Sequence, residues 1–291
     1  MSNDDTITWR EMLISTTEIV GDRIVAKWLC ENAAGVDSDG WLDVINDKVT
    51  QRCGLHLDAM MRRYLGGEPL QYVLGQWAFR HLDLMVDQRV LIPRPETEQL
   101  VDLVLDAVRS DFSENVRIAD LGTGTGAIGL SLLHELPLGR ARVWLTDNSN
   151  NAVDVARANL AGLGRAAMYG QIVIGSWYDA LPFDLRGSLD VVVSNPPYIA
   201  HDDREVENKV RDWEPHLALF ADDDGLSALR VIISGASNWL RKGGTLALEM
   251  GYAQAKAVCE LCNEAGLVDV TVHTDATNRE RFVTARAKSA E

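Results

Sequence analysis

The chain has 291 residues and a formal net charge of -15, and its hydrophobic fraction of 46% is ordinary for a globular core. This length allows one large domain together with a small one. The acidic balance argues against a nucleic-acid or anionic-membrane partner, because both favour a basic surface. No apolar run is long enough to span a bilayer, and the acidic start of the chain is unlike a signal or transit peptide.

The first seventy-odd residues are predicted to be helical, because apolar residues recur in them at three- and four-residue spacings. The expected helices cover 8–20, 23–32, 41–47 and 56–65, with glycines between them. These helices carry no evident catalytic chemistry. We therefore expect residues 1–75 to form a small helical domain that binds or positions a substrate.

Extended segments are predicted next, over 72–81 and 82–90, with a turn between them. Residues 76–90 are accordingly expected to form a β-hairpin linker. A Pro-x-Pro loop follows at 91–98, and its two prolines rule out regular structure there. We expect the larger domain to occupy residues 91–291.

Strands and helices alternate from residue 98 onward, which predicts an α/β fold with a doubly wound parallel sheet. Only a short turn separates the last two strands, so they are expected to form an antiparallel hairpin at the edge of the sheet. The expected strands are 116–121, 141–147, 170–175, 189–194, 244–250, 268–274 and 281–286, and the expected helices are 98–110, 127–135, 151–163, 224–241 and 253–265.

A glycine-rich loop lies between the strand at 116–121 and the following helix, and it consists of Gly122, Thr123, Gly124, Thr125 and Gly126. A strand, a glycine loop and a helix start form a nucleotide-type binding turn. The next strand ends in Asp147, whose carboxylate is well placed to accept hydrogen bonds from ribose hydroxyls. An NAD site and an S-adenosylmethionine (SAM) site share these features, and Asp147 has the alternative role of a helix N-cap.

The tetrapeptide Asn195-Pro196-Pro197-Tyr198 follows the apolar strand at 189–194. Two consecutive prolines cannot continue a strand ladder, so the chain leaves the sheet at the carboxyl end of a strand, where ligands bind in open α/β sheets. The Asn195 amide oxygen and the Pro196 carbonyl are acceptors, and Tyr198 offers a flat face. Such a set can hold a planar –NH2 group, although a strand-terminating turn would use the same residues.

Four cysteines are scattered along the chain, and Cys259 and Cys262 form a C-x-x-C motif. The motif falls inside a predicted helix, where both residues are expected to pack as small core residues. We therefore expect no metal site, and a reducing, cytoplasmic location fits this cysteine usage.

Taken together, the chain resembles the N5-glutamine methyltransferases that modify class 1 peptide chain release factors (the PrmC/HemK family). The resemblance covers nearly the whole chain, and the Pro-Arg-Pro loop combined with Asn-Pro-Pro-Tyr-Ile is its specific part. It rests on the segments 67–70, 91–98, 120–126, 194–199 and 213–215. It implies a seven-stranded, Rossmann-like, SAM-dependent methyltransferase domain behind a helical substrate-binding domain, acting on the glutamine of the release factors' Gly-Gly-Gln loop.

The resemblance also assigns roles to individual residues. The loop from Gly122 to Gly126 would wrap the methionine part and the ribose of SAM, Asp147 would accept from the ribose and Trp177 would stack on adenine. Asn195 would lie close to SAM. It would act with Pro196 and Tyr198 in catalysis, and Pro197 would help these three to hold the glutamine amide. Relatives often have Asp immediately before the tryptophan, where this chain has Ser176, which lacks the carboxylate that could accept from the adenine amino group.

Three other functions fit parts of the pattern. A DNA or RNA amino-methyltransferase would use the same residues, Asn195 to Tyr198, as a clamp for an –NH2 group. The acidic net charge weighs against this function. An NAD-dependent oxidoreductase would not explain Asn-Pro-Pro-Tyr. A non-catalytic SAM-sensing protein that docks through its helical domain would not need an intact clamp.

Overall fold

The computed structural model describes residues 7–111 and 114–289. The chain divides into two compact units, Met1–Gln76 and Trp77–Glu291, which we call the first and the second unit. Each is described by itself below.

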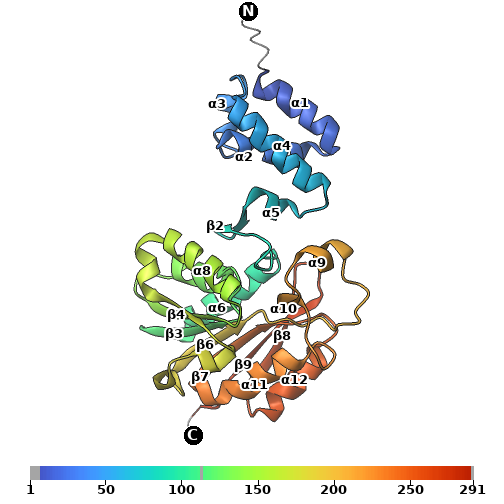
Figure 1. Cartoon of the computed structure of the whole chain (residues 1–291). Coiled ribbons are helices and arrows are strands. Elements are labelled where there is room, and N and C mark those ends of the chain that lie inside the picture. The colour runs from blue at the N-terminus through green and yellow to red at the C-terminus, as the bar shows by residue number, and fades with distance from the viewer. Residues whose placement is uncertain (1–6, 112–113, 290–291) are drawn as a thin grey trace, which may run out of the picture. The chain divides into compact units, whose positions relative to one another are not determined.

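Short helices make up the described part of the first unit (blue to cyan in Figure 1). Two of them begin at strong N-caps: Thr8 forms a capping box with Glu11, and Asp22 accepts from two backbone N–H groups. Trp9 and Trp41 meet edge to face in the core, with ring centroids 6.1 Å apart. The helices are α1 (Trp9–Val20), α2 (Arg23–Ala34), α3 (Trp41–Val44), α4 (Gln51–Leu65) and α5 (Leu70–Leu74).

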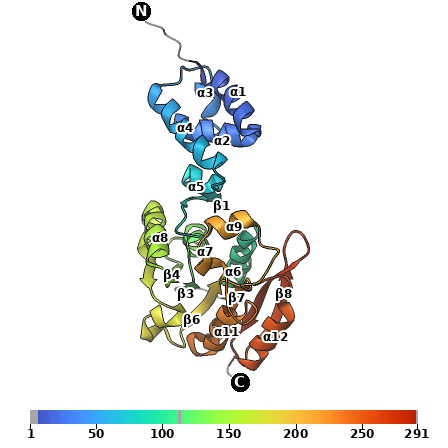
Figure 2. The same cartoon turned by 45° about the vertical axis from the view of Figure 1, so that its right-hand side comes forward.

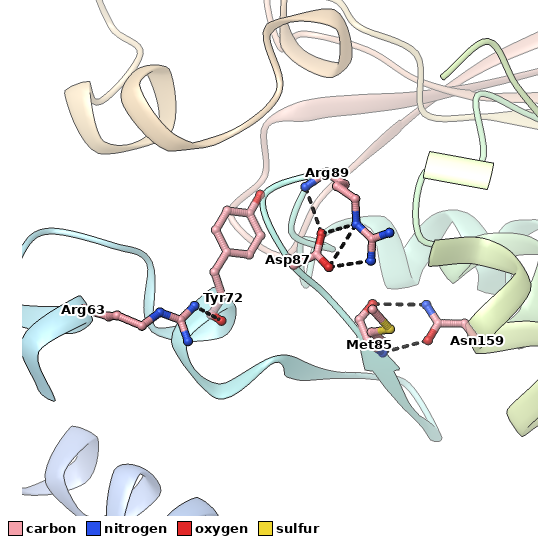
Figure 3. Close-up of polar contacts among 6 residues, drawn as sticks. All are labelled: Arg63, Tyr72, Met85, Asp87, Arg89 and Asn159. Carbon is pink, nitrogen blue, oxygen red and sulfur yellow. Dashed lines mark hydrogen bonds and ion pairs between the residues drawn. The ribbon is translucent and has the colours of Figure 1, made fainter. Parts of the chain in front are cut away.

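The prediction that residue 72 begins an extended segment is wrong, because Tyr72 lies inside α5. This helix is too short to be stable alone, so side chains must hold it. The Arg63 guanidinium, at the end of α4, donates to the Tyr72 carbonyl at 2.8 Å (Figure 3) and also forms an ion pair with Glu68. Gly75, in the left-handed conformation, then ends the helix.

A β-hairpin follows, with β1 (Gln76–Phe79) paired to β2 (Leu82–Met85). The second strand is shorter than predicted, because Asp87 accepts from the backbone and the side chain of Arg89 and bends the chain (Figure 3). Phe79 and Leu84 are buried in the core of the second unit. The hairpin turn is held there by Arg80, which forms ion pairs at 2.8 Å or less with Asp102 and Glu135.

The second unit contains a seven-stranded sheet of order β5-β4-β3-β6-β7-β9-β8, which confirms the predicted α/β methyltransferase-type fold. The first five strands in this order are parallel. The last strand of the chain, β9, lies between β7 and β8 and runs antiparallel to both. The strands are β3 (Val116–Leu121), β4 (Ala141–Asp147), β5 (Gly170–Ile174), β6 (Leu189–Ser194), β7 (Leu240–Glu249), β8 (Val268–Thr274) and β9 (Glu280–Arg286).

Helices cover both faces of this sheet. Leu100 of α6 and Leu130 of α7 pack with Val191 on one face, whereas Ile232 of α11 packs with Leu246 on the other. Figure 2 shows α11 and α12 side by side near β8. The helices are α6 (Thr97–Asp111), α7 (Ala127–Glu135), α8 (Asn150–Gly162), α11 (Ser227–Trp239) and α12 (Ala255–Glu264).

The predicted helix over 224–241 is too long at both ends, and the strand expected at 244 begins earlier. Leu240 starts β7 and pairs with Leu189, so sheet pairing takes over where the helical spacing still continued. Short helices that the sequence did not predict lie elsewhere in loops. They are η1 (Gly164–Tyr169), η2 (Trp177–Ala180), η3 (Phe183–Leu185), α9 (Asn208–Trp213) and α10 (His216–Leu219).

Candidate functional site

A cavity of about 610 Å³ lies at the carboxyl edge of the sheet. The strand order reverses between β3 and β6, and ligands bind at such a switch point in open α/β sheets. This volume is typical of cofactor and small-molecule sites. Its lining includes Gly122, Thr123, Gly124, Thr125, Asp147, Trp177, Asn195 and Pro197.

The glycine loop needs glycine for two reasons. Gly122, Gly124 and Gly126 all have positive φ, at 70°, 56° and 87°, where side chains are disfavoured. A Cβ on Gly122 would also lie 3.1 Å from Cζ3 of Trp177. The indole therefore packs directly on the loop backbone, and the two together form one wall of the cavity.

Asp147 supports this loop from the end of β4. Its Oδ2 accepts from the Gly124 N–H and its Oδ1 from the Ser149 N–H, both at 2.9 Å. The N-cap of α8 is Ser149, which accepts from the Ala152 N–H, so the alternative role of Asp147 as helix cap is wrong. Burial raises the pKa of Asp147, although these backbone N–H groups oppose the shift.

Asp120 lies beneath the loop and is fully buried. Its Oδ2 accepts from the Thr123 hydroxyl at 2.6 Å and from the Gly129 N–H at 2.9 Å. Burial raises the pKa of Asp120 to about 6. Within the described residues its Oδ1 has no hydrogen-bond partner. Asp120 thus links the start of the glycine loop to the first turn of α7.

Asn159 of α8 joins the loop to the hairpin. Its Oδ1 accepts from the Met85 N–H at 2.7 Å, and its Nδ2 donates to the Met85 carbonyl (Figure 3). The same Nδ2 also donates to the Thr125 carbonyl at 2.9 Å. A single buried amide thereby holds β2 and the glycine loop together.

Asn195 belongs to a buried chain of polar groups that the sequence did not reveal. Its Nδ2 donates to Oγ1 of Thr97 at 3.2 Å, and that hydroxyl donates to Oε2 of Glu249 at 2.7 Å. Tyr198 donates from its hydroxyl to Oε1 of the same glutamate at 3.1 Å. Glu249 ends β7 at the same sheet edge as Asn195, which is the signal that could have identified it. Thr97 lies in the Pro-x-Pro loop segment and begins α6.

The tetrapeptide residues do not all face the cavity. Asn195 and Pro197 line it, whereas Pro196 is buried and neither Pro196 nor Tyr198 lines it. Tyr198 is instead tethered behind it, through its hydroxyl and through its carbonyl, which accepts from Gln254. Gly126 also does not line the cavity, and Ser176 is exposed outside it.

Another part of the cavity lining comes from segments whose role the sequence did not reveal. Phe220 stacks on His201 with ring centroids 5.6 Å apart, and both line the cavity. Buried Glu214 accepts from the Ile92 N–H at 3.1 Å and from Arg94 at 2.5 Å. This ion pair joins the Pro-Arg-Pro loop to the segment 213–215.

Comparisons with known proteins agree with this geometry. Residues 98–212 match the family model "Methyltransferase small domain". A release factor glutamine methyltransferase of Xylella fastidiosa is 38% identical over 94% of this chain and 96% of its own, and one of Burkholderia pseudomallei is 44% identical over 77% of each chain.

Solved structures share the fold at low identity. A methyltransferase from Pyrococcus furiosus superposes with a TM-score of 0.51, at 16% identity over 80% of this chain and 100% of its own. The hMettl16 catalytic domain, solved with the MAT2A 3'UTR hairpin 6, gives 0.56 at 14% identity over 84% and 86%. Across the described residues, no helix has the length and apolar character needed to cross a membrane.

Proposed function

Because the chain belongs to the release factor glutamine methyltransferase family, we propose that it methylates the side-chain amide nitrogen (N5) of a glutamine, using SAM as the methyl donor. The substrate is the glutamine of the Gly-Gly-Gln loop of class 1 peptide chain release factors. The observation that carries the proposal is the buried chain from Glu249 through Thr97 to Asn195, which holds one amide at the cavity wall.

The residues present fit SAM. The glycine loop leaves a cradle that a Cβ at Gly122 would fill, and Trp177 supplies a flat apolar face beside it. Asp147 brings a carboxylate to the same cavity, suited to ribose hydroxyls. Gly122 to Gly126, Asp147, Trp177 and Asn195 are thus the proposed cofactor-binding residues. When bound, SAM supplies an electrophilic methyl group.

The protein's task is to orient a poor nucleophile. The lone pair of an amide nitrogen is delocalised into the carbonyl, so holding the group in the reactive geometry contributes much of the rate, up to roughly 7–11 kcal/mol. We assign Oδ1 of Asn195, which lines the cavity, as the acceptor for one amide hydrogen, and we propose the carbonyl of the next residue, Pro196, as the second acceptor, although Pro196 is not among the lining residues. Both acceptors bind the nitrogen more tightly as it becomes positive, which lowers the barrier.

Pro197 and Tyr198 complete the proposed substrate site in different ways. Pro197 lines the cavity, where it can pack on the glutamine. Tyr198 is held by Glu249 and Gln254, and its place next to Pro197 in the chain lets it fix the turn. Tyr198 therefore supports the clamp from behind.

The first unit is proposed to bind the release factor, with 76–90 as the connecting hairpin. Its surface exposes large apolar side chains, including Ile14, Ile24 and Leu42, which are 56%, 63% and 74% exposed. A partner that covers several of these side chains would remove their apolar area from water, which favours binding.

The alternative of a DNA or RNA amino-methyltransferase is not favoured. The relatives reported above are named release factor glutamine methyltransferases, and the net charge of -15 opposes binding to a polyanion. We accordingly propose a cytoplasmic protein whose substrate is a protein.

A labelling experiment tests the proposal. The enzyme is incubated with methyl-labelled SAM and one of three substrates: a class 1 release factor, the same factor with its Gly-Gly-Gln glutamine replaced by alanine, or duplex DNA. We expect label only on the unaltered factor. Label on DNA, or equal label on both factors, would overturn the assignment.

A further inference from the structure

We propose that Glu249 and Thr97 together decide which end of the Asn195 side-chain amide faces the cavity. The proposal rests on the proposed function, because it assigns two positioning residues to that reaction. It concerns the direction of hydrogen bonds, and therefore goes beyond the assignment of Asn195 itself.

Glu249 is the fixed end of the hydrogen-bonded series that runs through Thr97 to Asn195. Its side chain is only 2% exposed, and both oxygens are used, Oε1 by the Tyr198 hydroxyl and Oε2 by the Thr97 hydroxyl. An ionised carboxylate can only accept hydrogen bonds. Both hydroxyls must therefore point their hydrogens at Glu249.

The Thr97 hydroxyl in turn determines the orientation of the Asn195 amide. A hydroxyl has a single hydrogen, and that of Thr97 is directed at Glu249, 2.7 Å away. Toward Asn195, 3.2 Å away, Thr97 can then only accept. Asn195 must present its –NH2 end to Thr97, which leaves Oδ1 as the end available to a ligand in the cavity.

The two ends of an amide have nearly the same shape, so packing alone cannot distinguish them. A reversed Asn195 would direct a donor at the –NH2 group of the substrate, where an acceptor is required. The Thr97 hydroxyl therefore fixes which end of the Asn195 amide faces the cavity, and Glu249 sets the direction of that hydroxyl. We call this arrangement the polarity device.

Protonation of Glu249 would reverse the direction of the hydrogen bonds from Glu249 through Thr97 to Asn195. A protonated Oε2 would donate to Thr97, and the Thr97 hydroxyl would then be free to donate to Oδ1 of Asn195. Burial is the largest influence on Glu249 and raises its pKa. The hydrogen bonds from Thr97 and Tyr198 and the charge of Arg281 favour the ionised form, whereas the charge of Glu96 disfavours it.

The first test compares Thr97→Val with Thr97→Ser. Valine has nearly the same shape but no hydroxyl, whereas serine keeps the hydroxyl and loses a methyl group. With release factor and SAM, we expect Thr97→Val to lower kcat by about 10–100-fold, which is less than the loss of a whole preorganised polar contact because the Asn195 amide itself remains. Thr97→Ser should restore most of kcat. The KM for SAM should stay within about twofold in both variants, because the glycine loop, Asp147 and Trp177 are unchanged.

The second test uses Glu249→Gln, which keeps the shape but cannot accept at both ends. The kcat of the unaltered enzyme should fall on acidification, at a pH above the ordinary range of a glutamate, since only ionised Glu249 directs the chain correctly. In Glu249→Gln, kcat should be low and this acid-side fall should be absent. Circular dichroism and calorimetric SAM titration check that each variant folds.

The outcomes separate the inference from the proposed function. If the unaltered enzyme does not label the release factor, the proposed function fails. If it does, and Thr97→Val has the kcat of Thr97→Ser, or Glu249→Gln keeps the acid-side fall, the polarity device is overturned. Should Thr97→Val fail to fold, the pH profiles of the unaltered enzyme and Glu249→Gln decide alone.

Discussion

Asp147 is the residue whose role can be measured most directly. It accepts from the Gly124 and Ser149 N–H groups and lines the cavity. We predict that Asp147→Ala lowers SAM affinity by roughly ten- to a hundredfold, the value of a hydrogen bond to a charged group. Calorimetric titration measures the loss.

The matched control is Ser149→Ala. It removes the N-cap of α8 but leaves the Asp147 carboxylate, so it should lower the melting temperature with a smaller effect on affinity. Unchanged SAM affinity in Asp147→Ala would mean that this carboxylate serves the loop and not the cofactor.

A change at Gly122 shows whether the loop needs glycine for the room beside Trp177 or only for its positive φ. Gly122 and Gly21 both have positive φ, at 70° and 77°, but a Cβ would approach Trp177 to 3.1 Å at the former and nothing within 4 Å at the latter. Each change to alanine should cost about 1–2 kcal/mol of stability. Only Gly122→Ala should also weaken SAM binding. Equal SAM affinity in the two variants would show that the space beside Trp177 at Gly122 is not needed for SAM binding.

At the scale of the elements, α8 connects the hairpin to the glycine loop through one side chain. Asn159, 8% exposed, bonds both backbone groups of Met85 and the Thr125 carbonyl. Asn159→Leu keeps the volume and leaves these buried groups unsatisfied, so we predict a loss of about 1–3 kcal/mol in unfolding free energy and weaker SAM binding.

Chemical denaturation and SAM titration measure the two effects of Asn159→Leu. Asn151→Leu is the control, because it makes the same change at an exposed position of the same helix. If both variants lose stability equally, the hydrogen bonds of Asn159 do not link the elements.

The elements that could be predicted are those with a strong local pattern. The strand at 189–194 and the helix at 127–135 are as expected, because apolar residues alone define them. The helix α5 was missed, since it depends on Arg63, seven residues before its start, rather than on its own propensity.

The same limit applies to the site. Asn195 and the glycine loop stand out in the sequence, because proline pairs and repeated glycines have few structural uses. Thr97 and Glu249 do not, because nothing local connects them: they are 152 residues apart and meet only when α6 packs beside β7. The place of β9 between β7 and β8 is likewise a property of the whole sheet.

At the scale of the whole molecule, we propose that chemistry and recognition belong to different units of the chain. The described cavity is lined entirely by residues from Arg89 onward, inside the second unit. The hairpin also belongs there, because Phe79 and Leu84 are buried in its core. A chain that begins at Trp77 therefore keeps every residue proposed for SAM binding and for the amide clamp.

We predict that this truncated chain binds SAM as tightly as the full chain but methylates a folded release factor poorly. A flexible Gly-Gly-Gln loop loses conformational freedom when it enters the cavity, and a second contact made by the first unit offsets that loss. The kcat/KM for the release factor should fall by about a hundredfold, whereas that for a short glutamine peptide should change little, because a peptide makes no second contact. Equal losses on protein and peptide, with SAM affinity intact, would show that the first unit supports the catalytic geometry, and release factor docking would then have to be sought on the second unit.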